Sequence, residues 1–262
     1  MSWEKRKERL GKKVLEKLFN FGMIKTWYRD KPEGWTLVSG LWSPFYIQLR
    51  PLCSVERARE VLMLIGRSLG EVIRREAPDV NKIVGVAMAG IPIAIAVTME
   101  TGIPSCYTRK LPGIRNVELL EKYVKEYGEH RMVEGLLNDG DRVAVVDDLV
   151  TRFDSKLVAL RQIEWEAKRR GISVECKHVV VLLDREQGAE ERARKVGIKL
   201  HALIPFKSKG IEWLKNCLTE IEYEIIKDYL SNPSKYQEES IQRHLRKIAL
   251  EASVGSSHGT GR

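Results

Sequence analysis

The chain has 262 residues, a length that suits one large α/β domain with an appendage or two small domains. Hydrophobic residues make up 43% and charged residues 31%, a composition that places the chain among water-soluble globular proteins and excludes the disordered and membrane-spanning classes. The excess of Lys and Arg, 45 against 36 acidic residues, suits a polyphosphate substrate or a nucleic acid, or is merely a basic surface.

The N-terminal segment, residues 3–19, places Trp3, Leu10 and Leu18 on one face and predicts an amphipathic helix. Its basic face is typical of a solvated surface, so contact with nucleic acid is not expected. The segment lacks the continuous apolar core of a signal peptide, and we expect a cytoplasmic protein without a membrane span. Alternating apolar residues over 35–37 and 45–49 then suggest a short hairpin.

A regular alternation of strands and helices follows. Strands are predicted over 82–87, 103–108, 142–148, 177–184 and 199–205, and helices over 54–76, 91–102, 155–170 and 188–197, with Ser54 as a helix cap and an irregular charged stretch up to 137. Such alternation indicates an α/β fold, in which a parallel sheet is flanked by helices.

The strands stop after Pro205, where a T-x-x-E capping box at Thr219 and Glu222 opens a helix and a last helix is expected over 237–250. The Gly- and Ser-rich tail is not expected to stay ordered. We therefore divide the chain into a small N-terminal hood (1–53), a core (54–208) and a helical C-terminal extension (209–262).

The four cysteines lie far apart with no C-x-x-C pair, and the five histidines form no ligand-spaced cluster with them. A zinc site and a disulfide framework are both unexpected.

In an open parallel sheet, ligands bind beyond the carboxyl ends of the strands, close to helix N-termini. The segment VAMAGIP is expected there, and its Gly90 and Pro92 frame exposed backbone N–H groups of the kind that a diphosphate requires. An ordinary tight turn between a strand and a helix also uses these residues.

The segment VVDDLVT puts Asp147 and Asp148 at a strand end, where two carboxylates are costly to bury unless something positive or rich in hydroxyls lies between them. Ribose hydroxyls with Mg²⁺ satisfy that need; alternatively, the pair caps the next helix. Arg185 follows another apolar strand, and its planar guanidinium suits a carboxylate. A long charged loop adds Arg109, Lys110 and Lys125.

The segments WTLVSGLWSPFYIQLRP, VAMAGIPIA, YTRK, YGEHRMVEG, VAVVDDLVT and LLDREQGAE, in this order, resemble orotate phosphoribosyltransferase over about residues 35–203. Paired aspartates indicate only the wider phosphoribosyltransferase fold, whereas SPFYIQLR and DREQG are typical of the orotate branch. The resemblance implies the type I phosphoribosyltransferase fold. It also implies conversion of orotate and phosphoribosyl diphosphate (PRPP), with Mg²⁺, to orotidine 5′-monophosphate and pyrophosphate in pyrimidine synthesis.

The resemblance also assigns roles to single residues. It implies catalytic roles for Asp147, Asp148, Lys110 and Lys125; PRPP contacts from Ala89, Gly90, Arg109, Lys110, Lys125, Asp147, Asp148, Thr151, Arg152 and Ser155; and orotate contacts from Tyr46, Thr151 and Arg185. Mg²⁺ would enter with PRPP and lie near the two aspartates. The family's charged loop reaches into a neighbouring subunit, which implies a homodimer with shared sites.

The chain departs from the family at several positions. Val38 replaces a lysine, Tyr127 replaces a histidine, and the family's TTGGS or TAGTS loop has become TRFDS, in which Phe153 and Asp154 stand where small residues cradle the 5′-phosphate. Our interpretation is a remodelled site in which Arg152 contacts the phosphate and Asp154 turns away to cap the helix from Ser155. The alternative is a paralogue that binds a ligand without turnover and serves as a regulatory or interaction module.

Overall fold

The computed structural model describes residues 1–37, 40–127 and 130–257, so Val38 lies outside the described residues, as does the side chain of Tyr127. The chain divides into two compact units. The first comprises Met1–Val14 and Leu52–Phe206, and the second comprises Leu15–Pro51 and Lys207–Arg262.

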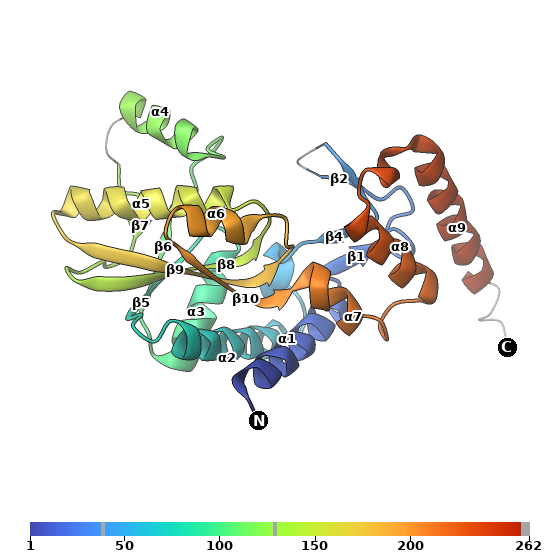
Figure 1. Cartoon of the computed structure of the whole chain (residues 1–262), viewed down its shortest axis with the longest axis horizontal. Coiled ribbons are helices and arrows are strands. Elements are labelled where there is room, and N and C mark those ends of the chain that lie inside the picture. The colour runs from blue at the N-terminus through green and yellow to red at the C-terminus, as the bar shows by residue number, and fades with distance from the viewer. Residues whose placement is uncertain (38–39, 128–129, 258–262) are drawn as a thin grey trace. The chain divides into compact units, whose positions relative to one another are not determined.

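A six-stranded sheet with the order β10-β9-β8-β5-β6-β7 forms the centre of the first unit (Figure 1). Its strands are β5 (Lys82–Gly85), β6 (Ser105–Thr108), β7 (Val133–Glu134), β8 (Asp141–Val150), β9 (Val174–Asp184) and β10 (Lys199–Pro205). All neighbouring strands pair in parallel except β6 and β7, which pair antiparallel. The expected α/β fold with a mostly parallel sheet is confirmed.

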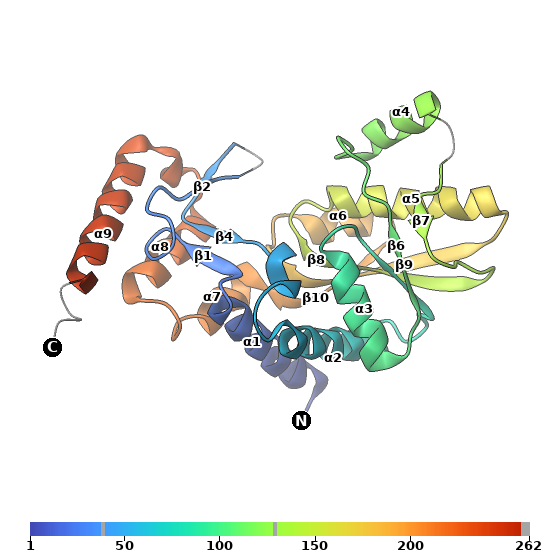
Figure 2. The ribbon, with the colours of Figure 1, turned by 180° about the vertical axis from the view of Figure 1, so that it is seen from behind.

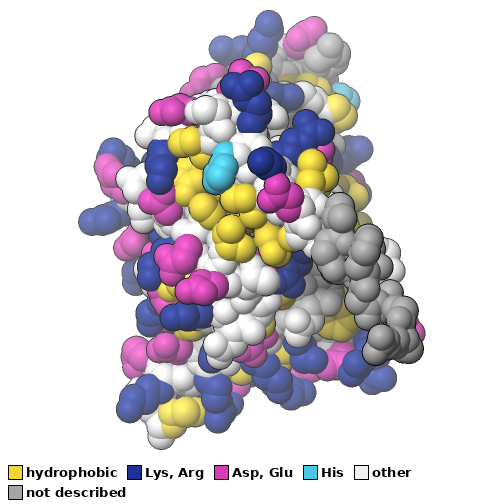
Figure 3. All heavy atoms as spheres, turned by 90° about the vertical axis from the view of Figure 1, so that its right-hand side faces the viewer, with side chains coloured by type: hydrophobic (Ala, Val, Ile, Leu, Met, Phe, Trp, Pro, Cys, Tyr) yellow, Lys and Arg dark blue, Asp and Glu magenta, His cyan; other side chains and the backbone are white. Residues whose placement is uncertain are grey.

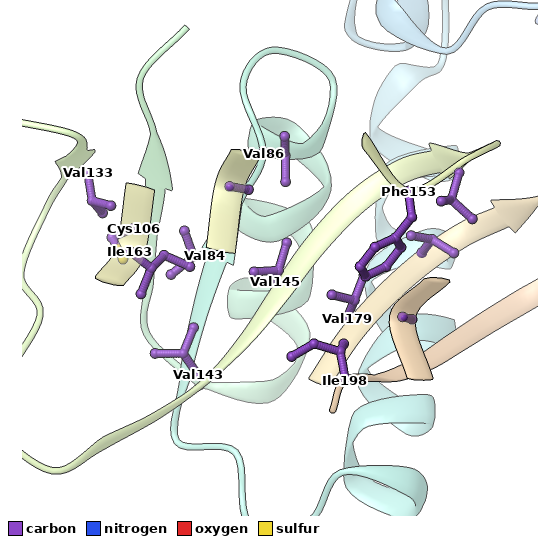
Figure 4. Packing of buried hydrophobic residues seen from close by; sticks show 14 of the residues in the cluster. Val84, Val86, Cys106, Val133, Val143, Val145, Phe153, Ile163, Val179 and Ile198 are labelled. Atoms are coloured by element: carbon purple, nitrogen blue, oxygen red, sulfur yellow. The ribbon is translucent and has the colours of Figure 1, made fainter. Parts of the chain in front are cut away.

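Helices cover both faces of this sheet, which explains why its central strands are continuous apolar runs. The helices α2 (Ala58–Glu76) and α3 (Gly90–Thr101) lie on one face, and α5 (Asp154–Arg170) and α6 (Ala189–Lys195) on the other (Figure 1). On the α5 face, Val84, Val145 and Val179 of the sheet pack in one buried cluster with Ile163 of α5 (Figure 4).

The predicted N-terminal helix is confirmed as α1 (Trp3–Asn20). In the part that belongs to the first unit, the Trp3 indole donates a hydrogen bond of 2.8 Å to Glu76, and Arg6 forms an ion pair with Glu71. Both acceptors lie on α2, so these contacts fasten the start of α1 to that helix.

Three sequence-based expectations about local structure are wrong. Ser54 does not cap the second helix, because a short 3-10 turn (Arg50–Cys53) precedes α2 and Arg57 holds its N-cap position at a φ of 64°. The stretch expected to be irregular contains α4 (Val117–Tyr127) and the edge strand β7. The many charges of α4 obscure its helical periodicity in the sequence, although Leu120 is fully buried.

The third error concerns the hairpin. The strand β2 (Trp35–Thr36) pairs with β3 (Trp42–Ser43), whereas β4 (Phe45–Ile47) pairs with β1 (Ile24–Thr26). The expected hairpin is therefore shorter than the alternation suggested, and a more distant strand completes the pairing.

The second unit also contains the C-terminal helices α7 (Ile211–Trp213), α8 (Glu220–Ser231) and α9 (Glu239–Ser257). The predicted capping box is confirmed at Thr219 and Glu222. The buried Glu222 carboxylate also accepts hydrogen bonds from Thr26 and Arg29. Burial alone would raise the pKa of Glu222, but these hydrogen bonds lower it. The helix α9 extends to Ser257, further than the sequence indicated.

Among the described residues, no helix is long and apolar enough to span a membrane. On the face drawn in Figure 3, Lys and Arg side chains alternate with Asp and Glu, and apolar side chains gather near the middle. The visible positive charge of this face forms no continuous basic patch of the kind that marks a nucleic-acid footprint.

Candidate active site

Most of the candidate residues lie at the carboxyl ends of four adjacent strands. Ala89 and Gly90 follow β5, and Arg109 follows β6 together with the exposed Lys110. Asp147, Asp148 and Thr151 lie at the end of β8, and Arg185 follows β9. Because the Arg185 amide donates a hydrogen bond of 3.0 Å to the Val150 carbonyl, Arg185 lies directly beside Thr151.

Two further candidates lie elsewhere. Lys125 is exposed on α4, which packs against α5 and is seen beside it from both directions (Figures 1 and 2). Tyr46 lies on β4 in the second unit, where its ring stacks on Trp35 with 6.0 Å between the ring centroids.

The turn between β5 and α3 lies tightly against the acidic pair. A Cβ atom at Gly90 would lie 2.6 Å from the Val146 carbonyl oxygen and 2.9 Å from Oδ1 of Asp147, so only glycine fits. The turn contains a cis peptide between Ala87 and Met88. The Ala87 amide donates to the Thr108 hydroxyl at 3.1 Å, which links this turn to the end of β6.

Asp147 is buried and forms an ion pair with Lys156, from the first turn of α5. Lys156 is 2% exposed, and its ammonium donates to Oδ2 of Asp147 at 2.6 Å, to the Leu149 carbonyl at 2.5 Å and to the Ser155 hydroxyl at 3.3 Å. An ammonium has three hydrogens, so these acceptors satisfy all of them. Oδ1 of Asp147 accepts the amide of Asp148 at 2.8 Å. Both carboxylate oxygens of Asp147 are therefore engaged within the chain.

Asp148 has a different environment. It is half-buried, and its carboxylate accepts the Leu149 amide at 2.7 Å. Burial, followed by the adjacent negative charge of Asp147, raises the pKa of Asp148 well above that of an ordinary aspartate, and the Lys156 charge only partly opposes this rise. The two neighbouring aspartates are thus electrostatically unequal.

Phe153 holds the position in the TRFDS loop where the chain turns into α5. Its φ of 74° is a left-handed conformation that favours glycine and costs a residue with a Cβ atom about 1–2 kcal/mol. The Phe153 ring is 1% exposed and points into the cluster that contains Val179 (Figure 4). Burial of a phenylalanine side chain contributes about 1.5–3 kcal/mol, which offsets the strain.

Asp154 is the first residue of α5, one position earlier than expected, and it does not cap the helix. Its carboxylate forms an ion pair of 2.7 Å with Arg192 of α6, which also donates to the Arg152 carbonyl. The hydrogen bond that Arg192 donates to Asp154 raises the pKa of Arg192. The expected cap is wrong because Arg192 offers Asp154 a charged partner; the Arg152 side chain is exposed.

The helix α5 also fastens both ends of the charged loop. Gln162 donates to the Arg109 carbonyl at 2.9 Å, and the Met132 amide donates to the buried Glu166 at 2.7 Å. Burial alone would raise the pKa of Glu166, but hydrogen bonds from Arg169, from the Met132 amide and from Arg170 lower it to about 2. The Arg109 side chain lies 3.5 Å from Glu134 of β7.

Lys156 is the site residue that the sequence analysis missed. One signal was available, because Lys156 shares a helical face with Ala159 and Ile163, which are both buried. A lysine on the buried face of a helix requires a partner, and the aspartates at the end of the preceding strand are candidates for it.

The described residues contain no cluster of three or more His, Cys, Asp or Glu side chains able to hold a metal ion. The Lys156 ammonium neutralises the Asp147 carboxylate and would repel a cation beside it, so Asp147 does not suit a direct metal ligand.

No family model matches the chain. It is, however, 33% identical to the orotate phosphoribosyltransferase of Pyrococcus furiosus over 168 residues, which are 64% of this chain and 81% of that protein. The chain belongs to the orotate phosphoribosyltransferase family.

Solved structures agree with that membership. The orotate phosphoribosyltransferase of Aeropyrum pernix has a TM-score of 0.57 and 25% identity, over 78% of this chain and 97% of that one. The UMP synthase of Leishmania donovani shares the fold, with a TM-score of 0.66 and 24% identity over 84% of this chain and 42% of that one. The parallel sheet with its flanking helices is therefore the type I phosphoribosyltransferase fold.

Proposed function

We propose that the protein is an orotate phosphoribosyltransferase, a pentosyltransferase that joins orotate to the phosphoribosyl group of PRPP and releases pyrophosphate. The observation that carries the proposal is the meeting of Gly90, Asp148, Thr151 and Arg185 at the carboxyl ends of adjacent strands, in a chain of this family. The product, orotidine 5′-monophosphate, belongs to pyrimidine synthesis, and a cytoplasmic location is part of the proposal.

In the proposed reaction, the bond between the anomeric carbon and the diphosphate oxygen breaks, and a bond to the ring nitrogen of orotate forms as that nitrogen loses its proton. The transition state is oxocarbenium-like, so catalysis depends on orientation, on cations around the leaving group and on the exclusion of water. Mg²⁺ enters as part of the PRPP substrate and neutralises its diphosphate.

The chain's own residues supply the orientation. The start of α3 at Ala89 and Gly90 faces the diphosphate, since a helix N-terminus favours anions. The Gly90 amide itself donates to the Val86 carbonyl at 2.9 Å, so Gly90 serves by leaving room for the ligand. Arg185 binds the carboxylate of orotate with its planar guanidinium, assisted by Thr151. Arg109, Lys110 and Lys125 of the charged loop supply positive charge to the leaving pyrophosphate.

The TRFDS loop, residues 151–155, is the phosphate loop of this proposal. Its structure supports a remodelled 5′-phosphate site rather than a lost one. Phe153 adopts a left-handed turn of the kind that glycine usually supplies, and Asp154 is neutralised by Arg192. The exposed Arg152 and Ser155 then contact the 5′-phosphate, with weakened PRPP affinity as the result.

We also propose a homodimer with shared sites. Apolar side chains are exposed along α3 and the turn before it, with Met88 62%, Ile95 49% and Met99 68% exposed. An apolar stripe on the outer face of a helix is typical of a protein interface. Ile95→Glu combined with Met99→Glu is expected to shift the protein to monomers in sedimentation measurements, whereas Val196→Glu, which replaces an exposed residue of the connection between α6 and β10, is not. Equal sedimentation of all three proteins contradicts the interface.

The test of the function is to mix the protein with orotate, PRPP and Mg²⁺ and follow the loss of orotate absorbance. Turnover is expected with orotate and not with uracil, which lacks the carboxylate. Arg185→Lys keeps the charge but loses the planar fork, and it is expected to raise the KM for orotate more than tenfold with an unchanged KM for PRPP. Turnover of uracil at the same rate contradicts the orotate assignment.

One observation favours a second candidate. The Asp154 carboxylate lies in the loop that would surround the phosphate, as expected of a paralogue that binds a ligand without turnover. Binding of PRPP and orotate without any loss of orotate absorbance is the result that this candidate predicts.

A further inference from the structure

The acidic pair at the end of β8 is closed on one side by α3. Gly90 approaches Asp147 so closely that no Cβ atom could be accommodated, and Asp147 is only 5% exposed. A ligand cannot reach the Asp147 carboxylate from the side of α3 without displacing that helix.

The other side is closed by Lys156. Its ammonium contacts the Asp147 carboxylate at 2.6 Å and has its other two hydrogens directed at Leu149 and Ser155. A ligand that took the place of Lys156 on Asp147 would leave a buried ammonium without its carboxylate. Separating a buried ion pair in this way is strongly unfavourable.

Asp148, the other aspartate of the pair, is less enclosed than Asp147. The Asp148 carboxyl lies close to that of Asp147 and senses the Lys156 charge, but Lys156 donates its hydrogen bonds to Asp147, Leu149 and Ser155 and not to Asp148. Asp148 is more exposed, and its contact at 2.7 Å is with the adjacent Leu149 amide, which leaves carboxylate lone pairs for a ligand.

We propose that the Lys156 ammonium holds Asp147 in an internal ion pair and thereby keeps its carboxylate from binding a ligand. Asp148 alone of the acidic pair then binds the ribose hydroxyls of PRPP. This inference rests on the proposed function, since it names the residue through which that site holds its substrate. Asp147 and Lys156 are then positioning residues: they fix the end of β8 against the first turn of α5, and with it the backbone of Asp148.

The first test compares PRPP binding by calorimetry, in the presence of Mg²⁺, for the wild-type protein, for Asp148→Asn and for the double variant Asp147→Asn with Lys156→Met. The double variant removes both charges together, so no buried charge is left alone. Asp148→Asn is expected to weaken PRPP binding at least thirtyfold, and the double variant less than fivefold. Lys168→Met, at an exposed position of α5, is the matched control with unchanged affinity.

Melting temperatures of the same proteins separate a positioning role from binding. Asp147→Asn alone, which leaves the Lys156 ammonium without its carboxylate, is expected to melt at a lower temperature than the double variant. Asp148→Asn should lose PRPP affinity without a comparable fall in melting temperature. If the double variant loses PRPP affinity as severely as Asp148→Asn while remaining folded, the inference is overturned.

The second test does not depend on PRPP. Acetylation of lysines with acetic anhydride, read by mass spectrometry, should leave Lys156 unmodified under conditions that modify Lys168, and Asp147→Asn should expose Lys156 to the reagent. Modification of Lys156 as fast as Lys168 in the wild-type protein overturns the enclosure. If Lys156 is protected but the wild-type protein binds no PRPP, the assignment of Asp148 is overturned with the proposed function, and the enclosure of Asp147 stands.

Discussion

The two strand-to-helix turns at the site reach the same edge of the sheet by different means. The turn from β5 into α3 depends on the absence of a side chain at Gly90, because any side chain there would collide with Val146 and Asp147. The turn from β8 into α5 depends on side chains, because Phe153 adopts a left-handed φ and holds it with a buried ring. A turn can therefore keep the geometry for which glycine is usual without keeping glycine, provided that a core lies within reach of the side chain.

The second turn is also reinforced by charge. Lys156 joins the first turn of α5 to the end of β8, and Arg192 joins Asp154 to α6. The two turns should therefore respond differently to substitution and to pH, the first through sterics and the second through packing and ionisation.

The largest effect is expected from removing the Phe153 ring. Phe153→Ala loses the buried ring but keeps the unfavourable φ, so we expect a loss of about 3–5 kcal/mol in the free energy of unfolding. Phe153→Gly loses the same ring but relieves the strain, and it should be about 1 kcal/mol more stable than the alanine variant. Urea denaturation of both variants measures the difference. An alanine variant more stable than the glycine variant would show that the left-handed turn is not strained.

Acid should lower the stability of the protein by protonating Glu166 on α5, the helix that follows the second turn. The pKa of Glu166 is about 2 in the folded protein and about 4.5 when unfolded, so its ionised form stabilises the fold above pH 4.5. This stabilisation is lost as the pH falls from about 4.5 toward 2, and it amounts to up to about 3 kcal/mol at 1.36 kcal/mol per pKa unit. Unfolding measured against pH should show a smaller acid-dependent loss for Glu166→Gln than for the wild-type protein. Parallel curves for the two proteins contradict this role of Glu166.

A side chain at Gly90 in the first turn should weaken both the stability of the fold and the binding of PRPP. Gly90→Ala forces a Cβ atom against the Val146 carbonyl, and overpacking of this kind costs about 1–3 kcal/mol. Because the displaced backbone is the part that faces the diphosphate, we expect PRPP affinity to fall more than tenfold. Calorimetry and urea denaturation together measure both effects. Unchanged PRPP affinity would show that the start of α3 does not face the diphosphate.

The smallest effect on stability is expected at the exposed pair of the second turn. Asp154→Asn breaks the ion pair with Arg192, whose loss costs about 0.2–1 kcal/mol at a partly exposed position. The same change removes a negative charge from the phosphate loop, and two like unit charges at 4 Å repel by up to about 4 kcal/mol at an effective dielectric of 20. Water screening leaves about a third of this at an exposed loop, so PRPP should bind about tenfold more tightly. Asp154→Glu, which keeps the charge, is the control. Unchanged affinity in both variants would place the phosphate outside this loop.

Much of the molecule could be predicted from the sequence because its signals are local. The apolar runs around Val145 and Val181 predicted central strands, and the T-x-x-E spacing predicted the start of α8 at Thr219. The edge strand β7 escaped prediction because two residues are too few for a periodic pattern, and its pairing with β6 joins segments that are distant in the sequence.

The sequence by itself determined the order of strands and helices, the strand end at which two aspartates occur, and the family to which the segments DDLVT and DREQG are similar. Only the tertiary structure decided how Phe153, Asp154 and Lys156 are used. Each of these residues acts through a partner brought close by folding: the core around Val179, Arg192 of a different helix, and Asp147 of the preceding strand. Side-chain burial and ion pairing depend on distances in space, and a sequence pattern records only distances along the chain.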